Sequence, residues 1–547
     1  MNNTGSTKRS PGASRQAGEH RKEPWTEQAA SFVGFFIYLL ILKSFFLPLF
    51  IIPTGSMAET LYGQHAMHTC PNCGTEYAVG WREPPPANWP SHVPYHPTAV
   101  TCPNCRWTEF PSFTGYPVQP PTDAQPSELL RQPLVPSAGD RIFVHGWPYA
   151  WPLSTIPALG PQRWDVVVFK VPRDGQTNYI KRLVGMPGEE IEIIDGDIYA
   201  DGKITQKTAE AQRSLWFAYY NQDHPPREPA LRNRYFPRWV PTHDDTAWAA
   251  LETRIPMYDG VGSPRGEIEF ITEPRLTDQA GQINDLYGYN QDGYPRNLGR
   301  LHMVSDTRLS AEVTFEDGQG YFELFSSKHY DRFTARLYAD GRLTLEHVSL
   351  EGGMPEELWG EVSGIPTDEP VTLALSNVDY VVSVLVNGEQ RIVSTDEQYS
   401  ITPEAARRFA VPRKRPVLKC AAEDVRLSVR HLLIERDVHY TVDYDEYKRP
   451  PNGATGAPLQ LGPDEYFMCG DNSPNSLDGR YWHADTIGPH LQDAYAAGEY
   501  TPGTVPADQM LGRAFFVYWP GFQPLNALGS APLPNCLPDL GRVRWIH

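Results

Sequence analysis

The chain has 547 residues, of which 40% are hydrophobic and 12% aromatic, so it is too long for one ordinary domain and apolar enough to bury several cores. Acidic residues outnumber basic ones by 66 to 48, which gives a formal net charge of −18. Because binding to phosphate groups requires a basic surface, this balance argues against a nucleic-acid partner. The sequence therefore predicts a multidomain protein with an acidic, solvated exterior.

Residues 29–52 are almost wholly apolar, and a segment of about 20 apolar residues can cross a bilayer as a helix. Five basic side chains lie in residues 1–28, which predicts that this tail stays cytoplasmic and that the chain after Pro53 lies on the opposite side. A cleaved signal peptide is the alternative. The charged leader is long and no small-residue cleavage site ends the apolar run, so the sequence favours a single-pass anchor.

Beyond the anchor the sequence predicts a mainly β fold. Its short β-branched or aromatic runs, bounded by Gly, Pro and Asp, are residues 165–170, 179–184, 190–194, 198–201 and 514–518. Two Asp-Gly turns, Asp195-Gly196 and Asp201-Gly202, flank one of these runs and predict a hairpin. Strands this short with turns this frequent indicate a small barrel or a folded sheet.

Five sequence blocks follow one another in an informative order. They are Ile-Pro-Thr-Gly-Ser-Met at 52–57, Gly-Asp-Arg-Ile-Phe-Val at 139–144, residues 165–169 with the Lys181-Arg182 segment 179–189, the Gly-Asp-Asn segment 466–482, and residues 512–519. Together they resemble type I signal peptidases, membrane-anchored serine proteases with a Ser-Lys dyad that remove leader peptides from exported proteins. The resemblance covers about 200 residues and implies a catalytic core at the outer face of the inner membrane.

The resemblance implies a role for each of four residues. Ser56 is the expected nucleophile, and Lys181 is the expected base that takes its proton. An exposed lysine stays protonated near pKa 10.4, so Lys181 can act as a base only where burial disfavours its charged form. The Thr54 hydroxyl and the Ser56 N–H would form the oxyanion hole, and the Ser476 hydroxyl would orient the lysine amine. No cofactor is expected for catalysis.

The resemblance also implies a structural role for Asp478 with Arg480, together with Asp471. Their ion pairing would hold the Gly-Asp-Asn segment against the strand that carries Lys181. The chain departs from the family pattern at three places: Ser473-Pro474 after Gly-Asp-Asn, Gly479 before Arg480, and Trp164 before Asp165. None of these departures removes an expected catalytic group.

A first insertion, residues 69–136, carries two Cys-Pro-Asn-Cys knuckles. Their thiolates, from Cys70, Cys73, Cys102 and Cys105, could bind one structural Zn²⁺ in a tetrahedral, zinc-ribbon-like site. Disulfides are the competing interpretation, because the segment is expected outside the cytoplasm. The Pro-Asn turns favour zinc. Four sulfurs fill the coordination sphere, so no catalytic metal is expected.

A second insertion, residues 205–435, shows tightly alternating apolar and polar positions between Asp-Gly and Asn-Gly turns, the pattern of an antiparallel β-sandwich. It resembles concanavalin A-like or laminin G-like jelly rolls, which implies that it could bind a glycan or a protein or could merely pack. Residues 436–441 look like the strand that returns to the catalytic core. The expected division is therefore a tail at 1–28, an anchor at 29–52, a catalytic core at 53–68, 137–204 and 436–547, and insertions at 69–136 and 205–435.

The sequence as a whole predicts a membrane-bound serine endopeptidase that removes signal peptides from secretory preproteins. Cleavage after small residues at the first and third positions before the bond is implied by the resemblance alone. Lipid and preproteins are the expected partners. One alternative is a membrane-tethered binding protein that works through the sandwich and keeps an inactive protease scaffold. Another is a Ser-Lys peptidase with a different target, such as a self-cleaving regulator.

Overall fold

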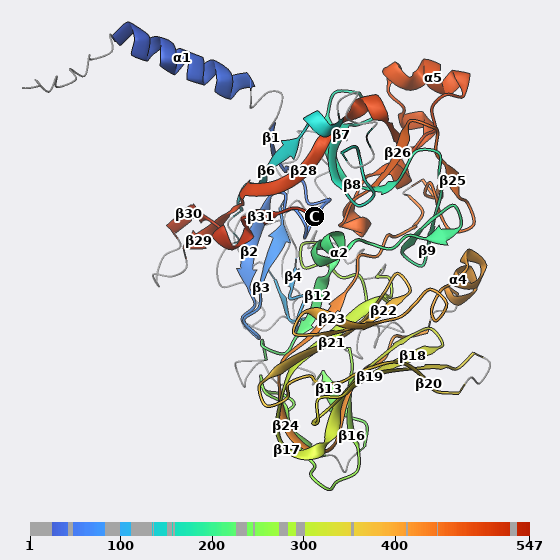
Figure 1. The fold of residues 1–547 in the computed structure, drawn as a ribbon. Helices are drawn as coiled ribbons and strands as arrows, with labels where there is room; N and C mark the ends of the chain where they lie inside the picture. The colour runs from blue at the N-terminus through green and yellow to red at the C-terminus, as the bar shows by residue number, and fades with distance from the viewer. Residues whose placement is uncertain are drawn as a thin grey trace, which may run out of the picture.

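A computed structural model describes the chain in fifteen stretches of sequence. These are residues 25–41, 48–81, 99–110, 134, 136–149, 156, 159–225, 238–243, 247–272, 283–290, 301–351, 355–411, 414–445, 447–525 and 533–547. The predicted mainly β fold is confirmed: most of the elements are strands, and the strands form two large bodies, with helix α1 (Trp25–Ile41) apart from both (Figure 1).

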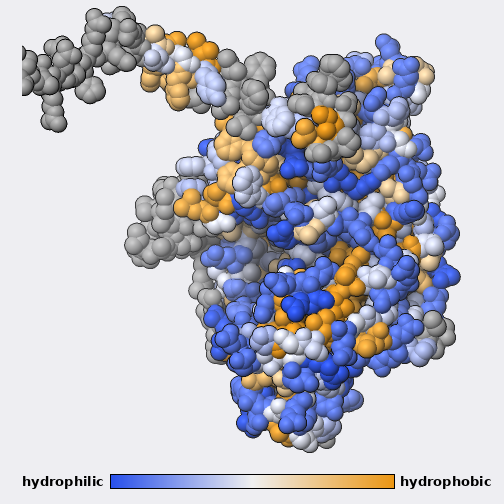
Figure 2. Space-filling model, viewed as in Figure 1, coloured by the Kyte–Doolittle hydropathy of each residue, from blue (hydrophilic) through white to orange (hydrophobic). Residues whose placement is uncertain are grey.

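The apolar run at 29–52 is not one continuous helix. Helix α1 ends at Ile41, and strand β1 (Leu49–Ile51) pairs with β6 (Arg141–His145), so the end of the run joins a sheet. Backbone pairing with β6 offers the last residues of the run ladder hydrogen bonds in place of helical ones. Side chains such as Phe32 and Phe35 leave an apolar surface exposed on α1 (Figure 2).

Within the part of the chain described here, no helix is both long enough and apolar enough to cross a membrane.

One antiparallel sheet of the upper body carries four of the five motif blocks. Its hydrogen-bonded order is β1, β6, β28 (Met510–Trp519), β7 (Val166–Lys170), β8 (Asn178–Gly185), β26 (Glu465–Cys469) and β27 (Thr504–Pro506), with β31 (Arg544–Trp545) added to β28. Apolar residues alternate along these strands and pack on both faces of the sheet. The strands expected at 165–170, 179–184 and 514–518 are therefore confirmed.

A smaller sheet adjoins it, with the order β11 (Lys203–Ile204), β10 (Asp197–Ala200), β9 (Glu190–Ile194) and β25 (Leu459–Gln460). The two expected Asp-Gly turns are present, with positive φ at both residues of Asp195-Gly196 and of Asp201-Gly202, as a type I′ turn requires. Helix α2 (Ala209–Leu215) packs on this sheet, and helices α4 (Pro403–Phe409) and α5 (Gln492–Ala497) lie farther along the chain.

The lower body is the sandwich that the alternating pattern predicts (Figure 1). Its strands are β12 (Phe217–Asn221), β13 (Trp239–Pro241), β14 (Trp248–Ala249), β15 (Met257–Asp259), β16 (Gly266–Phe270), β17 (Thr307–Lys328), β18 (Asp331–Tyr338), β19 (Leu343–Ser349), β20 (Glu357–Val362), β21 (Val371–Val378), β22 (Val381–Val386), β23 (Glu389–Val393) and β24 (Leu418–Arg436). The first half of β17 pairs with β21 and its second half with β18, so this one strand belongs to both layers.

Three two-stranded hairpins complete the fold. They pair β2 (His65–Thr69) with β3 (Glu76–Gly80), β4 (Val100–Thr101) with β5 (Thr108–Glu109), and β29 (Phe522–Leu525) with β30 (Leu533–Pro538). The strand expected at 436–441 does not form: β24 ends at Arg436, and the residues after it have no strand partner among those described. Instead the N–H of Tyr440 donates to the Gly196 carbonyl in the turn between β9 and β10.

Candidate functional site

The loop that carries Ser56 is fixed by apolar anchors on either side of the serine. Ile52, Met57 and Leu61 are buried in the core beneath β6, β7 and β28. The Ala58 N–H donates to the Gly55 carbonyl, which closes a turn around Ser56 and leaves its side chain partly exposed. Met57 packs into this core and does not line the cleft above Ser56.

Lys181 lies on β8 with its amine directed at Ser56. Its Nζ is 2.6 Å from Ser56 Oγ and donates to the Ile180 carbonyl at 2.9 Å. The side chain is buried, and burial lowers the pKa of Lys181 to about 8, although the carboxylates of Asp478 and Asp471 act to raise it. The environment therefore provides what a lysine base requires, an amine with a substantial neutral fraction near neutral pH.

A cleft with a volume of about 760 Å³ opens over this pair. One wall consists of residues 53–56 with Gln64, Gly80, Trp81 and Tyr289, the second is the start of β8 at 177–181, and the third is residues 474–477. Both Ser56 and Lys181 reach the cleft, so a chain that entered it would meet the hydroxyl and the amine together.

The two expected hydroxyl partners lie in the same cleft. Thr54 is exposed at its edge, and Ser476 is buried where Gly470 approaches closely: a Cβ added to Gly470 would lie 2.2 Å from Ser476 Oγ. Ser476 Oγ makes no hydrogen bond of ordinary geometry to a described residue, although its hydroxyl contributes to lowering the pKa of Asp478. The serine is thus close to the dyad without a hydrogen bond to the lysine.

Asp471 and Arg182 form the ion pair that joins the Gly-Asp-Asn segment to strand β8. The guanidinium donates twice to the carboxylate, at 2.8 and 2.7 Å, and both side chains are fully buried. The Thr60 hydroxyl donates to the same carboxylate at 2.6 Å, which ties in the turns that follow Ser56. Arg182 therefore orients three segments around the dyad, and the sequence analysis had not assigned it a role.

Asp478 and Arg480 also form a two-point pair, but both belong to the Gly-Asp-Asn segment, so this pair does not bridge to strand β8 as expected. Burial acts to raise the pKa of Asp478, and the guanidinium of Arg480 outweighs it, so the pKa is lowered. Arg480 also donates to Ser473 Oγ, and Asp478 accepts from the Gly470 N–H. The pair shapes the turn that follows Gly-Asp-Asn, and Ser473, a departure from the family pattern, is part of it.

The four cysteines of the two knuckles converge. Cys70 Sγ lies 3.6 Å from Cys105 Sγ, Cys73 Sγ lies 3.6 Å from Cys102 Sγ, and all four sulfurs are buried within 4.8 Å of one another. A disulfide needs about 2.05 Å between sulfurs, whereas a tetrahedral Zn²⁺ with bonds of about 2.3 Å holds its sulfurs about 3.8 Å apart. The cluster has the donor set and the spacing for a structural Zn²⁺.

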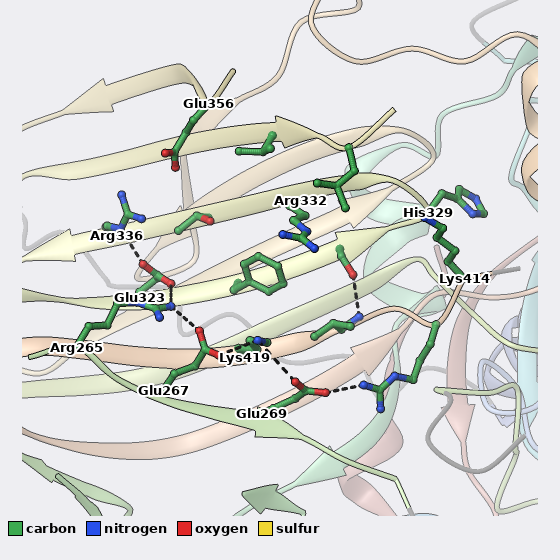
Figure 3. Close-up of a pocket in the computed structure, with 17 residues that line it drawn as sticks. Arg265, Glu267, Glu269, Glu323, His329, Arg332, Arg336, Glu356, Lys414 and Lys419 are labelled. Carbon is green, nitrogen blue, oxygen red and sulfur yellow. Dashed lines mark hydrogen bonds and ion pairs between the residues drawn. The ribbon is translucent and has the colours of Figure 1, made fainter. Parts of the chain in front are cut away.

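A second cavity, of about 520 Å³, lies on one face of the sandwich (Figure 3). We call it the sandwich groove, and its charged lining residues are Arg265, Glu267, Glu269, His329, Glu323, Arg332, Arg336, Glu356, Lys414, Arg415 and Lys419. Ion pairs run across the strands, with Glu267, Glu269 and Glu323 each contacting two cations. Arg332 and Lys414 form no ion pair with any residue that the structure describes.

Two further residues near Ser56 and Lys181 were not named from the sequence, Asn472 and Tyr289. The Asn472 side chain donates to the Gly55 carbonyl at 2.9 Å, and its N–H donates to the Ser56 carbonyl at 3.1 Å, so it holds the loop that carries Ser56. Tyr289 comes from residues 283–290, which precede β17 and form part of the second insertion. Asn472 lies in the quoted block and could have been named, whereas nothing local to Tyr289 indicates a cleft.

The family "Signal peptidase, peptidase S26" matches residues 133–242 and 385–519, slightly under half of the chain. The matched residues include Lys181, Asp471 and Ser476, whereas Ser56 precedes them and residues 243–384 lie between the two matched segments.

Curated relatives match a shorter stretch. Signal peptidase I of Rickettsia canadensis (strain McKiel) is 47% identical over 51 residues, and that of Rickettsia typhi (strain ATCC VR-144 / Wilmington) is 48% identical over 51 residues. In both cases the match spans 9% of this chain and 19% of the relative. The chain thus spans about a fifth of the length of the curated relatives it matches.

Solved structures match a part of the chain at low TM-scores. The carbohydrate-binding module CBM66 from Bacillus subtilis matches with a TM-score of 0.23 and 12% identity, covering 36% of this chain and 95% of that one. The Ca²⁺-bound exoplasmic/lumenal domain of VIP36 matches with a TM-score of 0.24 and 8% identity, covering 40% and 89%. Similarities at these TM-scores support no inference about a ligand.

Proposed function

Because this chain is a relative of the type I signal peptidases, we propose that it is a serine endopeptidase that removes signal peptides from secretory preproteins. The observation that carries the proposal is the 2.6 Å approach of the Lys181 amine to the Ser56 hydroxyl inside a cleft. Ser56 attacks the scissile carbonyl, and the neutral amine of Lys181 takes the hydroxyl proton as the bond forms. The same amine then returns that proton to the leaving nitrogen.

The electrostatics of the site support this mechanism. With a pKa of about 8, roughly one lysine in ten is neutral at pH 7, a much larger fraction than for an exposed lysine. The Ser56 N–H, which has no hydrogen-bond acceptor among the described residues, and the Thr54 hydroxyl at the cleft edge would stabilise the oxyanion. Ser476, buried beside Gly470, would orient the amine once substrate excludes water.

We also propose that the chain acts at a membrane, held by the apolar segment 29–52, with the catalytic domain on the extracytoplasmic side. The exposed aromatic side chains of α1 support attachment to an apolar phase, because a large exposed apolar surface is unusual on a soluble domain. The basic residues of the tail at 1–28 favour its cytoplasmic side.

Two finer proposals concern the insertions. Cys70, Cys73, Cys102 and Cys105 would hold a structural Zn²⁺, which fits their sulfur spacing and which catalysis does not use.

The sandwich would bind an acidic glycan in the sandwich groove, through the cations of Arg332 and Lys414. The groove lies on the face of a sheet, so it offers side-chain donors and acceptors for hydroxyl groups and no free strand edge for a peptide backbone.

Cleavage of a model preprotein by the purified full-length protein in detergent tests the proposed function. Ser56→Ala and Lys181→Ala are each expected to lower kcat/KM by at least about a thousandfold. Lys170→Ala is the matched control, because Lys170 lies on the neighbouring strand β7 and its amine donates to the Gln176 carbonyl at 2.7 Å. An uncut preprotein with the wild type, or undiminished cleavage by either dyad variant, would reject the proposal.

A further inference from the structure

Residues 283–290 leave the sandwich and reach the catalytic cleft, although they lie in the part of the chain between the two family-matched segments. The Tyr287 hydroxyl donates to the Asp471 carbonyl at 2.7 Å. The Asn290 and Asn472 side-chain amides exchange hydrogen bonds of 2.7 Å in both directions. The Gly80 N–H donates to the Tyr289 carbonyl at 2.8 Å. The segment is therefore attached to the Gly-Asp-Asn segment at one side and to strand β3 at the other.

The ring of Tyr289 is held beside the nucleophile from several directions. A Cβ added to Gly55 would lie 1.9 Å from the ring, and one added to Gly80 would lie 2.6 Å from it, so both glycines are in direct contact with its face or edge. The ring stacks on Tyr62 at 5.8 Å between centroids, and its hydroxyl donates to the Gln64 carbonyl at 2.6 Å. The side chain is almost fully buried and yet lines the cleft.

This placement makes the ring a wall rather than a lid. Gly55 directly precedes Ser56, so the ring borders the space next to the attacking hydroxyl. Because a ring that is hydrogen-bonded and stacked cannot swing away cheaply, a large substrate side chain directed at this wall would have to displace it or clash with it. A small side chain would fit without either cost.

We propose that Tyr289 is a specificity-determining residue of the cleft, and that its ring excludes large substrate side chains from the position that faces Gly55 and Gly80. The inference rests on the proposed function only in taking a peptide as the occupant of the cleft. It assigns to the second insertion a direct share in substrate selection, carried by a residue outside the family-matched segments.

A purely structural role for Tyr289 makes a different prediction. If the ring only fastened the insertion to the core, its loss would lower activity toward every substrate by the same factor. A wall, by contrast, changes the ratio between substrates that differ in one side chain. The measured quantity is therefore the ratio of kcat/KM values, which stays independent of the overall rate.

The experiment uses full-length protein in detergent and two peptides that differ only in alanine or leucine at a scanned position before the scissile bond. Tyr289→Ala is expected to shift the leucine-to-alanine ratio of kcat/KM upward by about tenfold or more at one position. Tyr289→Phe keeps the ring and is expected to leave the ratio within about twofold. Tyr287→Phe is the matched control, because it removes a hydrogen bond of the same segment without changing the wall.

Variants of Tyr289 with side chains of different size keep the test informative if one of them fails to fold. If Tyr289→Ala fails to fold, judged by its thermal transition, Tyr289→Leu opens less space and is expected to give a smaller shift in the same direction. Equal losses for both peptides with an unchanged ratio, at every position scanned, would overturn the inference.

A binding measurement separates this inference from the proposed function. In the Ser56→Ala background, fluorescence anisotropy of the same labelled peptides reports Kd without any cleavage. Adding Tyr289→Ala is expected to lower the Kd of the leucine peptide relative to that of the alanine peptide. If this selectivity appears while the enzyme with Ser56 cuts neither peptide, the proposed function fails and the inference stands. If the Ser56→Ala protein binds neither peptide, the inference falls.

Discussion

Arg182 and Asp471 form a fully buried ion pair that joins strand β8 to the Gly-Asp-Asn segment through two hydrogen bonds. Lys181 precedes Arg182 on the same strand, and successive side chains of a strand point to opposite faces. Lys181 therefore faces Ser56 while Arg182 faces Asp471. One short stretch of sequence supplies both the proposed base and the anchor that holds the opposing wall of the site in register.

Removal of this anchor is expected to destabilise the protein strongly. Arg182→Met leaves the Asp471 carboxylate buried without its cation, which costs about 3–5 kcal/mol in the free energy of unfolding. Urea unfolding of the full-length protein measures the change. Arg426→Met is the matched control, since its pair with Asp259 is exposed on both sides and contributes little to stability. A loss for Arg182→Met no larger than that of the control would contradict the assignment.

The pH dependence of cleavage reports the ionisation of Lys181. The base must be neutral, so kcat/KM is expected to rise about tenfold per pH unit below pH 8 and to level off above it. The direction follows from burial, which lowers the pKa by disfavouring the ammonium form. A profile that falls between pH 6 and 8, or that is flat there, would show that an amine of this kind does not limit the reaction.

The free energy of unfolding is also expected to rise with pH because of the Lys181 amine. Because the folded pKa lies below the unfolded value, the unfolded chain binds more protons between about pH 8 and 10.5, and stability rises with pH across that window. Lys181→Met removes the buried ammonium and is expected to flatten this rise. The comparison of urea midpoints at pH 8 and pH 10 for the two proteins measures the effect, and parallel changes in both would refute it.

The sequence alone predicted the strands and turns whose signals lie in neighbouring residues. Period-two alternation and Asp-Gly turns predicted the strands near Ser56 and Lys181 and the sandwich class of the second insertion. In the alternating pattern of the second insertion, Asp317-Gly318 and Gly320 look like a turn that would end a strand. In the structure these residues form bulges in β17, and Gly320 lies so close to the Glu423 carbonyl that no Cβ would fit, so one strand bends instead of ending.

The parts of the site that sequence could not predict depend on contacts between distant segments. Arg182 looks like an ordinary charged strand residue until Asp471, 289 positions later, is placed opposite it. Tyr289 reaches Gly55 from the second insertion without any pattern that marks it. Asp478 and Arg480, by contrast, were rightly paired, but their short spacing confines the pair to its own turn, and the sequence alone did not reveal that limit.

The cysteine cluster predicts a measurable metal content. Protein prepared without chelator is expected to contain about one Zn²⁺ per chain by elemental analysis, because the four sulfurs lie at the spacing of a tetrahedral site. Cys70→Ser is expected to lower both the zinc content and the thermal stability. Cys420→Ser, which changes a buried thiol of the sandwich, is the control and should keep its zinc. Absence of metal together with thiols that resist alkylation under native and denaturing conditions would favour disulfides.

The sandwich groove predicts a charge-dependent ligand. Arg332 and Lys414 line it without an ion partner among the described residues, although Lys414 lies over the Tyr330 ring. Glu267, Glu269 and Glu323 are already paired with other cations, and Glu356 also lines the groove (Figure 3). Arg332 and Lys414 are therefore the two cations that would meet an anionic group. Polygalacturonate, an acidic glycan, is expected to bind in isothermal titration, and dextran, a neutral one, is not. Replacing both cations by alanine should weaken binding at least about tenfold and reduce its dependence on salt.

The control for this experiment is Arg391→Ala, which removes an exposed cation of the same sandwich on strand β23, outside the groove. It is expected to leave polygalacturonate binding unchanged, so that a loss caused by the double variant is attributable to the groove and not to net charge. Equal binding of dextran and polygalacturonate would contradict the role of the two cations. Binding of polyglutamate in preference to polygalacturonate would replace the glycan with an acidic peptide as the ligand.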